Sequence, residues 1–150
     1  LNFSDANIGF HVSLLTLLGI ASSPLMGWAS DKSSRRGVIF FSLAGLTILS
    51  GLLLYFDSGI GFTIILACTG IFLYSVNPIM MAAAIDATNR GTESSGVALM
   101  FTGGSILGAL SPILAGQLRQ TFGMDAVFIY TTTILTIVTI GSLLVPMKRL

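Results

Sequence analysis

Five long stretches without any Asp, Glu, Lys or Arg divide this chain of 150 residues, and they limit what it can fold into. Each stretch holds at least 20 residues, about the length that an α-helix needs to cross the hydrocarbon core of a bilayer. Only helices and closed barrels satisfy their backbone there, and the alternating pattern of barrel strands is absent. The sequence therefore predicts five spanning helices, at about residues 7–30, 37–56, 59–85, 93–118 and 125–147.

The low content of charged residues supports this interpretation. Charged residues make up 9% of the chain, whereas a soluble domain carries roughly 25%. So little charge cannot cover a globule in water, and it offers no basic surface for nucleic acid. The single Cys68 excludes an internal disulfide, and no metal cluster, cofactor motif or nucleophile–base pair is recognisable. We therefore expect an all-α, polytopic transmembrane helix bundle that lies in a lipid bilayer, uses no cofactor and is not an enzyme.

The distribution of basic residues predicts the orientation of the helices. The second and fourth connections between the predicted helices hold one basic residue, Arg119. The first and third connections and the C-terminal tail hold six, namely Lys32, Arg35, Arg36, Arg90, Lys148 and Arg149. Because basic residues collect on the cytoplasmic side, we expect a multi-pass protein of the cell membrane with a cytoplasmic C-terminus. Five crossings that start outside also suggest a fragment that lacks at least one earlier helix, if the N-terminus of the whole protein is cytoplasmic.

The stretch GWASDKSSRRG concentrates charge at the end of the first predicted helix, with Gly27 followed by Asp31, Lys32, Arg35 and Arg36. A cytoplasmic topology signal needs the basic residues, but it needs neither Gly27 nor Asp31. A glycine would let a neighbouring helix approach closely. The aspartate can accept hydrogen bonds from a facing helix N-terminus or pair with an arginine, and the arginines can pair with carboxylates or lipid phosphate. The cluster is thus either a topology signal alone or also a latch between helices.

The middle of the third predicted helix carries polar side chains next to a proline. Tyr74, Ser75 and Asn77 precede Pro78, which leaves the carbonyl of Tyr74 without its usual donor. One interpretation is that Ser75 and Asn77 satisfy this carbonyl locally. The other is that these side chains line a polar cavity and touch a substrate near the midplane of the membrane, where transporter sites usually lie.

The fourth predicted helix carries a stripe of small residues, in which Gly104, Gly108, Pro112 and Gly116 recur every four positions. Such a stripe is typical of close packing between helices. The alternative is a cavity-lining helix that is kinked near Pro112, and Thr102 is then a further candidate for contact with a substrate.

Three other ionisable residues are candidates for function. Asp86 and Arg90 are four residues apart and can pair on one helix face, or they can simply be a solvated helix end. His11 lies a few residues inside the outer boundary of the first predicted helix. Interfacial placement explains it, and a role in a gate or in proton coupling is the alternative.

The charged stretch resembles the loop signature of the major facilitator superfamily, G-x-x-x-D-R-x-G-R-R/K. Ser34 departs from the usual glycine and Ala29 from the usual leucine. The RGT sequence of residues 90–92 and the basic tail also resemble this superfamily, and the degraded signature favours helices eight to twelve over helices two to six. The resemblance implies a carrier that works by alternating access, in which the charged cluster is a conformational latch and Asp86 and Arg90 belong to a cytoplasmic gate.

Two classes of function remain open from the sequence. The leading one is transport of a small molecule, with H⁺ as a candidate coupling ion and the N-terminal half of the same protein as the expected partner. The other is a polytopic membrane protein without transport, such as a sensor or an assembly scaffold. An intramembrane enzyme is disfavoured, because no catalytic pair of polar residues lies within the predicted helices.

Overall fold

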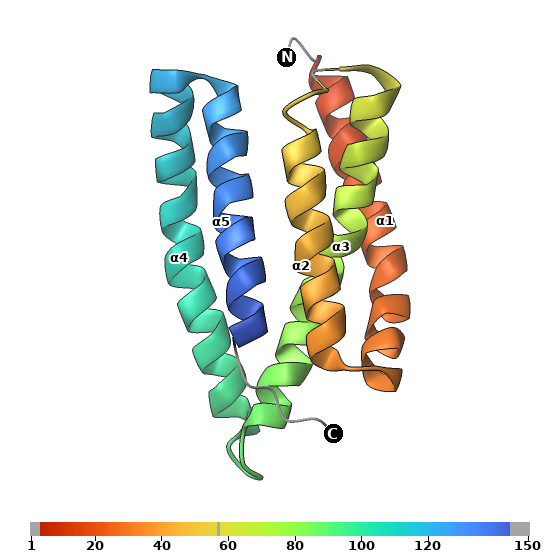
Figure 1. Ribbon diagram of the computed structural model, residues 1–150, viewed down its shortest axis with the longest axis vertical. Coiled ribbons are helices and arrows are strands. Elements are labelled where there is room, and N and C mark those ends of the chain that lie inside the picture. The colour runs from red at the N-terminus through yellow and green to blue at the C-terminus, as the bar shows by residue number, and fades with distance from the viewer. Residues whose placement is uncertain (1–3, 57, 145–150) are drawn as a thin grey trace.

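The computed structural model describes residues 4–56 and 58–144, and within them it forms five α-helices that lie side by side (Figure 1). All five are long and apolar enough to cross a membrane, so the expected all-α bundle of five spanning helices is confirmed. Asp57 and the basic residues Lys148 and Arg149 lie outside the described residues. The helices are α1 (Asp5–Lys32), α2 (Arg35–Leu52), α3 (Gly59–Ala87), α4 (Glu93–Phe122) and α5 (Met124–Leu144).

The connections alternate between the two ends of the bundle. The α1–α2 and α3–α4 connections lie at one end, and the α2–α3 and α4–α5 connections lie at the other (Figure 1). Ser34 begins α2 by accepting a hydrogen bond from the backbone N–H of Gly37 at 3.4 Å. Gly123 alone joins α4 to α5, and its φ of +87° is a conformation that glycine adopts without strain. The chain therefore runs along the length of the bundle five times, as the five uncharged stretches predicted.

Helix α3 is the centre of the bundle, since it packs against α1, α2 and α4. Helix α5 packs mainly against α2, on the side away from α1. One buried apolar cluster, formed by Ile39, Leu43 and Ile79, joins α2 to α3 toward the charged end. A second cluster, formed by Leu53, Phe62 and Ile65, joins the α2–α3 corner at the other end.

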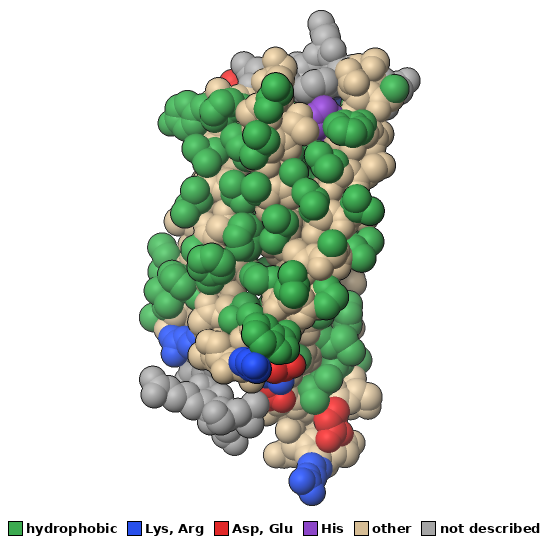
Figure 2. All heavy atoms as spheres, turned by 90° about the vertical axis from the view of Figure 1, so that its right-hand side faces the viewer, with side chains coloured by type: hydrophobic (Ala, Val, Ile, Leu, Met, Phe, Trp, Pro, Cys, Tyr) green, Lys and Arg blue, Asp and Glu red, His purple; other side chains and the backbone are tan. Residues whose placement is uncertain are grey.

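Most of the apolar surface of the bundle faces outward. Among the described residues, α4 has no buried side chain, and large apolar residues are exposed along all five helices. Figure 2 shows a broad apolar band in the middle of one face and a concentration of Lys, Arg, Asp and Glu below it. An apolar exterior that ends in charge is the arrangement expected of a bundle whose solvent is lipid.

Helices α1 and α3 cross at very close range because two glycines lie at the crossing. A Cβ on Gly70 would overlap the backbone carbonyl of Leu15, and a Cβ on Gly19 would lie 2.7 Å from the carbonyl oxygen of Gly70. Ser22 adds a polar link, because its hydroxyl lies 3.1 Å from the carbonyl oxygen of Ile71. Small residues that allow backbones to meet are the usual basis of helix association in membranes.

Candidate functional site

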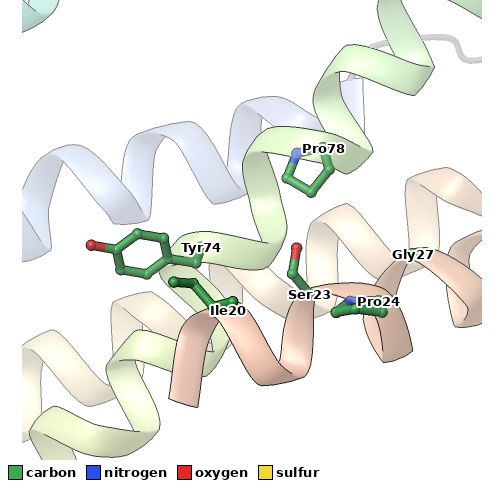
Figure 3. A pocket seen from close by; sticks show the side chains of 6 residues that line it. All are labelled: Ile20, Ser23, Pro24, Gly27, Tyr74 and Pro78. Carbon is green, nitrogen blue, oxygen red and sulfur yellow. The ribbon is translucent and has the colours of Figure 1, made fainter. Parts of the chain in front are cut away.

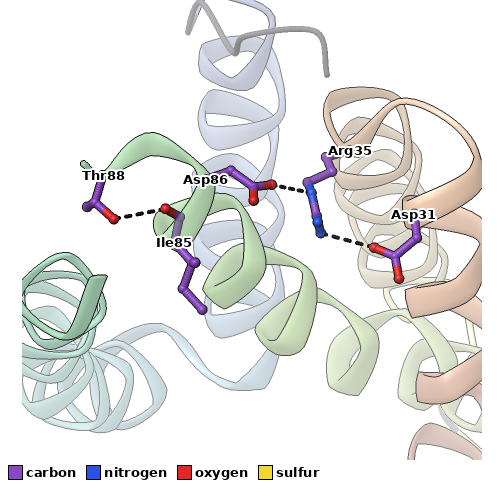
Figure 4. A network of polar contacts seen from close by, with 5 residues as sticks. All are labelled: Asp31, Arg35, Ile85, Asp86 and Thr88. Atoms are coloured by element: carbon purple, nitrogen blue, oxygen red, sulfur yellow. Dashed lines mark hydrogen bonds and ion pairs between the residues drawn. The ribbon is translucent and has the colours of Figure 1, made fainter. Parts of the chain in front are cut away.

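Arg35 occupies the centre of a polar network at the charged end of the bundle. It lies in the first turn of α2, and its guanidinium forms ion pairs with Asp31 at the end of α1 and with Asp86 at the end of α3 (Figure 4). The pair with Asp31 measures 3.3 Å from Nη1 to Oδ1, and the pair with Asp86 joins Nε to Oδ2. One arginine thus links the ends of three helices.

The two carboxylates of this network differ in exposure. The side chain of Asp31 is 68% exposed, that of Asp86 is 31% exposed, and that of Arg35 is 24% exposed. Water screens the pair with Asp31 more strongly, so the pair with Asp86 contributes more to holding the helices together. We refer to Asp31, Arg35 and Asp86 as the Arg35 network.

The other basic residues of the charged stretch have different partners. The guanidinium of Arg36 donates to the backbone carbonyl of Leu143, which lies one residue before the end of α5. The ammonium of Lys32 lies 4.4 Å from the centre of the Trp28 ring on its own helix, a distance typical of a cation–π contact. Among the described residues Arg36 therefore bonds to a helix end, where a cation is favoured by the helix dipole, rather than to a carboxylate. Its pairing with lipid phosphate stays a prediction.

The expected ion pair between Asp86 and Arg90 does not form among the described residues. Helix α3 ends at Ala87, so Arg90 lies in the following turn and no longer shares a helix face with Asp86. Thr88 completes the end of α3 with a hydroxyl that donates to the carbonyl of Ile85 at 2.8 Å (Figure 4). Asp86 instead pairs with Arg35, a contact between α3 and α2 that the spacing along the sequence could not predict.

Gly27 also differs from its expected role. A Cβ at Gly27 would meet nothing within 4 Å, so no helix of the described chain approaches it closely. It lies at the edge of an open groove of about 450 Å³ between α1 and α3 (Figure 3). The residues that line the groove are Ile20, Ser23, Pro24, Gly27, Tyr74 and Pro78. Both prolines lie inside helices that continue past them.

The candidate cavity residues of α3 lie in three different surroundings in the structure. Tyr74 lines the groove, and its hydroxyl lies 3.2 Å from that of Thr16 on α1. Ser75 is completely buried between α3 and α1, and its hydroxyl donates to the carbonyl of Ile71 at 2.6 Å. It therefore neither lines the groove nor satisfies the carbonyl of Tyr74, contrary to both interpretations of the sequence. Asn77 is exposed and is not among the residues that line the groove.

Helix α4 carries the remaining candidates on exposed positions. A Cβ at Gly104, Gly108 or Gly116 would meet nothing within 4 Å, so the small-residue stripe does not pack against another described helix. The expected packing role is therefore not fulfilled within this chain. The helix continues through Pro112, and Thr102 is exposed.

His11 links the other ends of α1 and α3. Its Nδ1 lies 2.6 Å from the carbonyl oxygen of Asn7, which can only accept, so Nδ1 carries a proton. Its Nε2 lies 2.9 Å from the hydroxyl of Thr63 on α3, which in turn lies 3.1 Å from the carbonyl oxygen of Gly59. If Nε2 is protonated, it donates to Thr63 and Thr63 donates to Gly59. If Nε2 is not protonated, Thr63 must donate to Nε2 instead.

Two hydroxyl pairs between α2 and α5 were not identified from the sequence. The hydroxyls of Thr47 and Thr139 lie 3.0 Å apart, and Thr132 donates to Ser50 at 3.0 Å. Hydroxyls that bond across helices are a common means of association in lipid. The run of threonines in α5 is the signal that could have identified them, although it does not say which helix they face.

The fold and the polar network define a class of protein, namely an integral membrane helix bundle whose spanning helices are joined by ion pairs at one end. The family model described as the Major Facilitator Superfamily matches residues 1–149. The chain belongs to the Major Facilitator Superfamily, and the recognition that was based on the loop signature is confirmed.

Curated relatives come from two bacteria and carry the same name. The chain is 26% identical over 132 residues to the multidrug resistance protein MdtG of Dickeya zeae (strain Ech586), and 28% identical over 132 residues to MdtG of Rahnella sp. (strain Y9602). These alignments cover 86% and 85% of this chain, but the chain spans only 31% of the length of either relative. No solved structure matches the chain significantly.

Proposed function

We propose that this chain is part of a secondary transporter that moves a small molecule across the cell membrane by alternating access. The observation that carries the proposal is the Arg35 network, which joins the ends of α1, α2 and α3 through side chains that remain partly exposed to water. Alternating access needs contacts that hold one end closed in one state and separate in another. Ion pairs near the membrane surface suit this task, because water can solvate the charges once they part.

The names of the two relatives suggest the kind of substrate. Both are called multidrug resistance proteins, so the proposal includes a drug-like molecule as the cargo of the full-length protein. No Asp, Glu, Lys or Arg lies in the middle of a spanning helix of this chain. We therefore expect hydroxyl, carbonyl and aromatic groups, rather than a charged pair, to supply the contribution of this chain to binding.

Transport by the full-length protein in proteoliposomes tests the proposal, with Hoechst 33342 and 1-pyrenylmethylammonium as fluorescent drug-like cargoes. We expect flux in the parent and its near loss in Arg35→Gln, while both proteins insert equally well. Arg119→Gln is the matched control, since it removes a positive charge from a position near the other end of the bundle. The absence of flux in the parent would contradict the proposal and favour the alternative, a sensor or an assembly scaffold without transport.

The proposal assigns the charged end of the bundle to the cytoplasm, because the described basic residues Lys32, Arg35, Arg36 and Arg90 collect there. A reporter that is active only in the cytoplasm, inserted at Asp57 or fused after Arg149, measures the orientation. We expect activity after Arg149 and none at Asp57. The reverse pattern would overturn the assignment.

We also propose that proton movement is coupled to transport through His11. Protonation of Nε2 reverses the hydrogen bond with Thr63, which joins α1 to α3 and can itself donate to the first turn of α3. His11→Gln keeps a side chain that forms hydrogen bonds but has no ring nitrogen that can take up a proton. We therefore predict that this variant uncouples flux from an imposed pH gradient. If flux in His11→Gln still responds to the gradient as in the parent, His11 is a structural link only.

A further inference from the structure

Four of the six residues that line the α1–α3 groove form two matching pairs. Pro24 follows Ile20 by four positions on α1, and Pro78 follows Tyr74 by four positions on α3. Proline has no backbone N–H, so it cannot donate to the carbonyl four residues earlier in its helix. The carbonyls of Ile20 and Tyr74 therefore both lack their usual donor, and both belong to residues at the groove (Figure 3).

No side chain of the described residues replaces the missing donors. The hydroxyls of Ser22 and Ser75 lie near these carbonyls in sequence, but they bond to the carbonyls of Gly19 and Ile71 instead. Ser23 extends from α1 toward α3 in Figure 3, and within the part of the chain that the structure describes its hydroxyl has no hydrogen bond. Backbone carbonyls without donors are costly at membrane depth, so a ligand that brings donors would be favoured there.

The chemistry of the groove selects one class of ligand. The residues that line it carry no charge, and their side chains offer only the hydroxyls of Ser23 and Tyr74, the ring of Tyr74 and apolar groups. The backbone of Ile20 and Tyr74 adds the two carbonyls that lack their usual donor. Such a surface repels an anion, whereas carbonyl oxygens that lack a donor and aromatic rings both attract cations. We propose that the groove binds a lipophilic primary amine in its ammonium form, whose N–H groups donate to the carbonyls of Ile20 and Tyr74.

The size of the groove fits such a ligand. Its volume of about 450 Å³ lies within the range of roughly 300–1,000 Å³ that is typical of sites for drug-sized molecules. Gly27 lies at one end of the groove, where a Cβ would meet nothing within 4 Å. The proposal names the substrate class for the transporter function proposed above and in this sense rests on it, but binding can be measured without transport.

A matched pair of ligands tests the role of the N–H groups. The full-length protein in nanodiscs of neutral lipid is titrated with 1-pyrenylmethylammonium and with its N,N,N-trimethyl derivative, which keeps the charge and the ring but has no N–H. Loss of a charge-assisted hydrogen bond costs about tenfold or more in affinity. We therefore expect the trimethyl derivative to bind about tenfold more weakly.

A matched pair of variants tests which carbonyls accept the hydrogen bonds. Pro78→Ala restores an N–H that can occupy the carbonyl of Tyr74, so it should weaken binding of the primary ammonium about tenfold and change binding of the trimethyl derivative little. Pro112→Ala makes the same change in α4, outside the groove, and should leave the affinity for the primary ammonium as in the parent. Should Pro78→Ala fail to insert, Pro24→Ala gives the same test at the carbonyl of Ile20.

Several outcomes would overturn the proposal. Equal affinity for the two ligands in the parent would mean that the groove is an apolar surface that does not distinguish ligands with N–H donors from ligands without them. An equal loss in Pro78→Ala and Pro112→Ala would mean that proline acts on helix shape rather than through a carbonyl in the groove. Because the assay measures binding alone, selective binding without flux would contradict the transporter function and leave the amine site standing.

Discussion

Removing Asp86 from the Arg35 network should open the charged end of the bundle more than removing Asp31. Both carboxylates pair with Arg35, but Asp86 is 31% exposed and Asp31 is 68% exposed. An exposed ion pair contributes about 0.2–1 kcal/mol, which changes a ratio of two states by no more than about fivefold. A partly buried, charge-assisted pair contributes about 1.5 kcal/mol at the lower end of its range, which corresponds to about tenfold.

The assay uses Asn77→Cys, an exposed position of α3, as a reporter in full-length protein that has no other cysteine. A membrane-impermeant maleimide is applied from the side of the charged end, and the rate of labelling measures the open population. We expect Asp86→Asn to raise the rate about tenfold and Asp31→Asn to raise it about fivefold or less. Glu93→Gln is the control, since it removes a carboxylate at the same end that bonds to the N–H of Gly91 and lies outside the Arg35 network.

A double-mutant cycle with Arg35→Gln separates the ion pair from the general effect of charge. If Asp86 acts through Arg35, then adding Asp86→Asn to Arg35→Gln should change the labelling rate very little. Two results would refute the reasoning. One is a labelling rate in Asp86→Asn equal to that in Glu93→Gln, and the other is a pair of effects that simply multiply in the double variant.

Two further predictions concern the packing of the helices. Gly70→Val should lower the Tm of the full-length protein clearly, because the valine side chain would overlap the backbone of α1 and overpacking costs about 3 kcal/mol. Gly108→Val, at an open position of α4, is the control and should have little effect. Equal Tm values for the two variants would contradict the close crossing. Thr139→Val removes the hydrogen bond to Thr47 and should lower the free energy of unfolding by about 0.6 kcal/mol. The control is Thr133→Val, because the hydroxyl of Thr133 bonds only within its own helix. An equal loss of stability in both variants would show that the bond between helices contributes nothing.

The number and approximate positions of the helices could be predicted because charge is rare in this chain. Each charged residue interrupts an apolar stretch, so the bounds of the stretches lie close to the helix ends. The prediction was less accurate where charge does not end the helix. Helix α4 continues past Arg119 to Phe122 because its end is set by Gly123, whose positive φ of +87° is a conformation that glycine adopts without strain. Helix α2 ends at Leu52, before the last apolar residues of its stretch.

The partners of the polar residues could not be predicted, because they depend on which helices meet. The spacing of Asp86 and Arg90 favoured a pair within one helix, but α3 ends between them and Arg35 of α2 lies closer. The regular stripe of small residues favoured close helix packing on α4, whereas the glycine that α1 contacts most closely is Gly70 of α3. Position 19 of α1 did carry a usable signal, because Gly19, Ser23 and Gly27 also recur every four residues.

The polar contacts divide four of the helices into two pairs, with the Arg35 network between them. Helices α1 and α3 are joined by the Gly19–Gly70 crossing and by Ser22. Helices α2 and α5 are joined by two hydroxyl pairs and by the bond from Arg36 to the end of α5. Arg35 belongs to the second pair, and both of its carboxylate partners belong to the first. The apolar cluster of Ile39, Leu43 and Ile79 also joins α2 to α3, but apolar side chains in lipid hold helices together through packing alone. Separation of the two pairs at the charged end therefore requires loss of the ion pairs of one residue, while the contacts within each pair can remain intact.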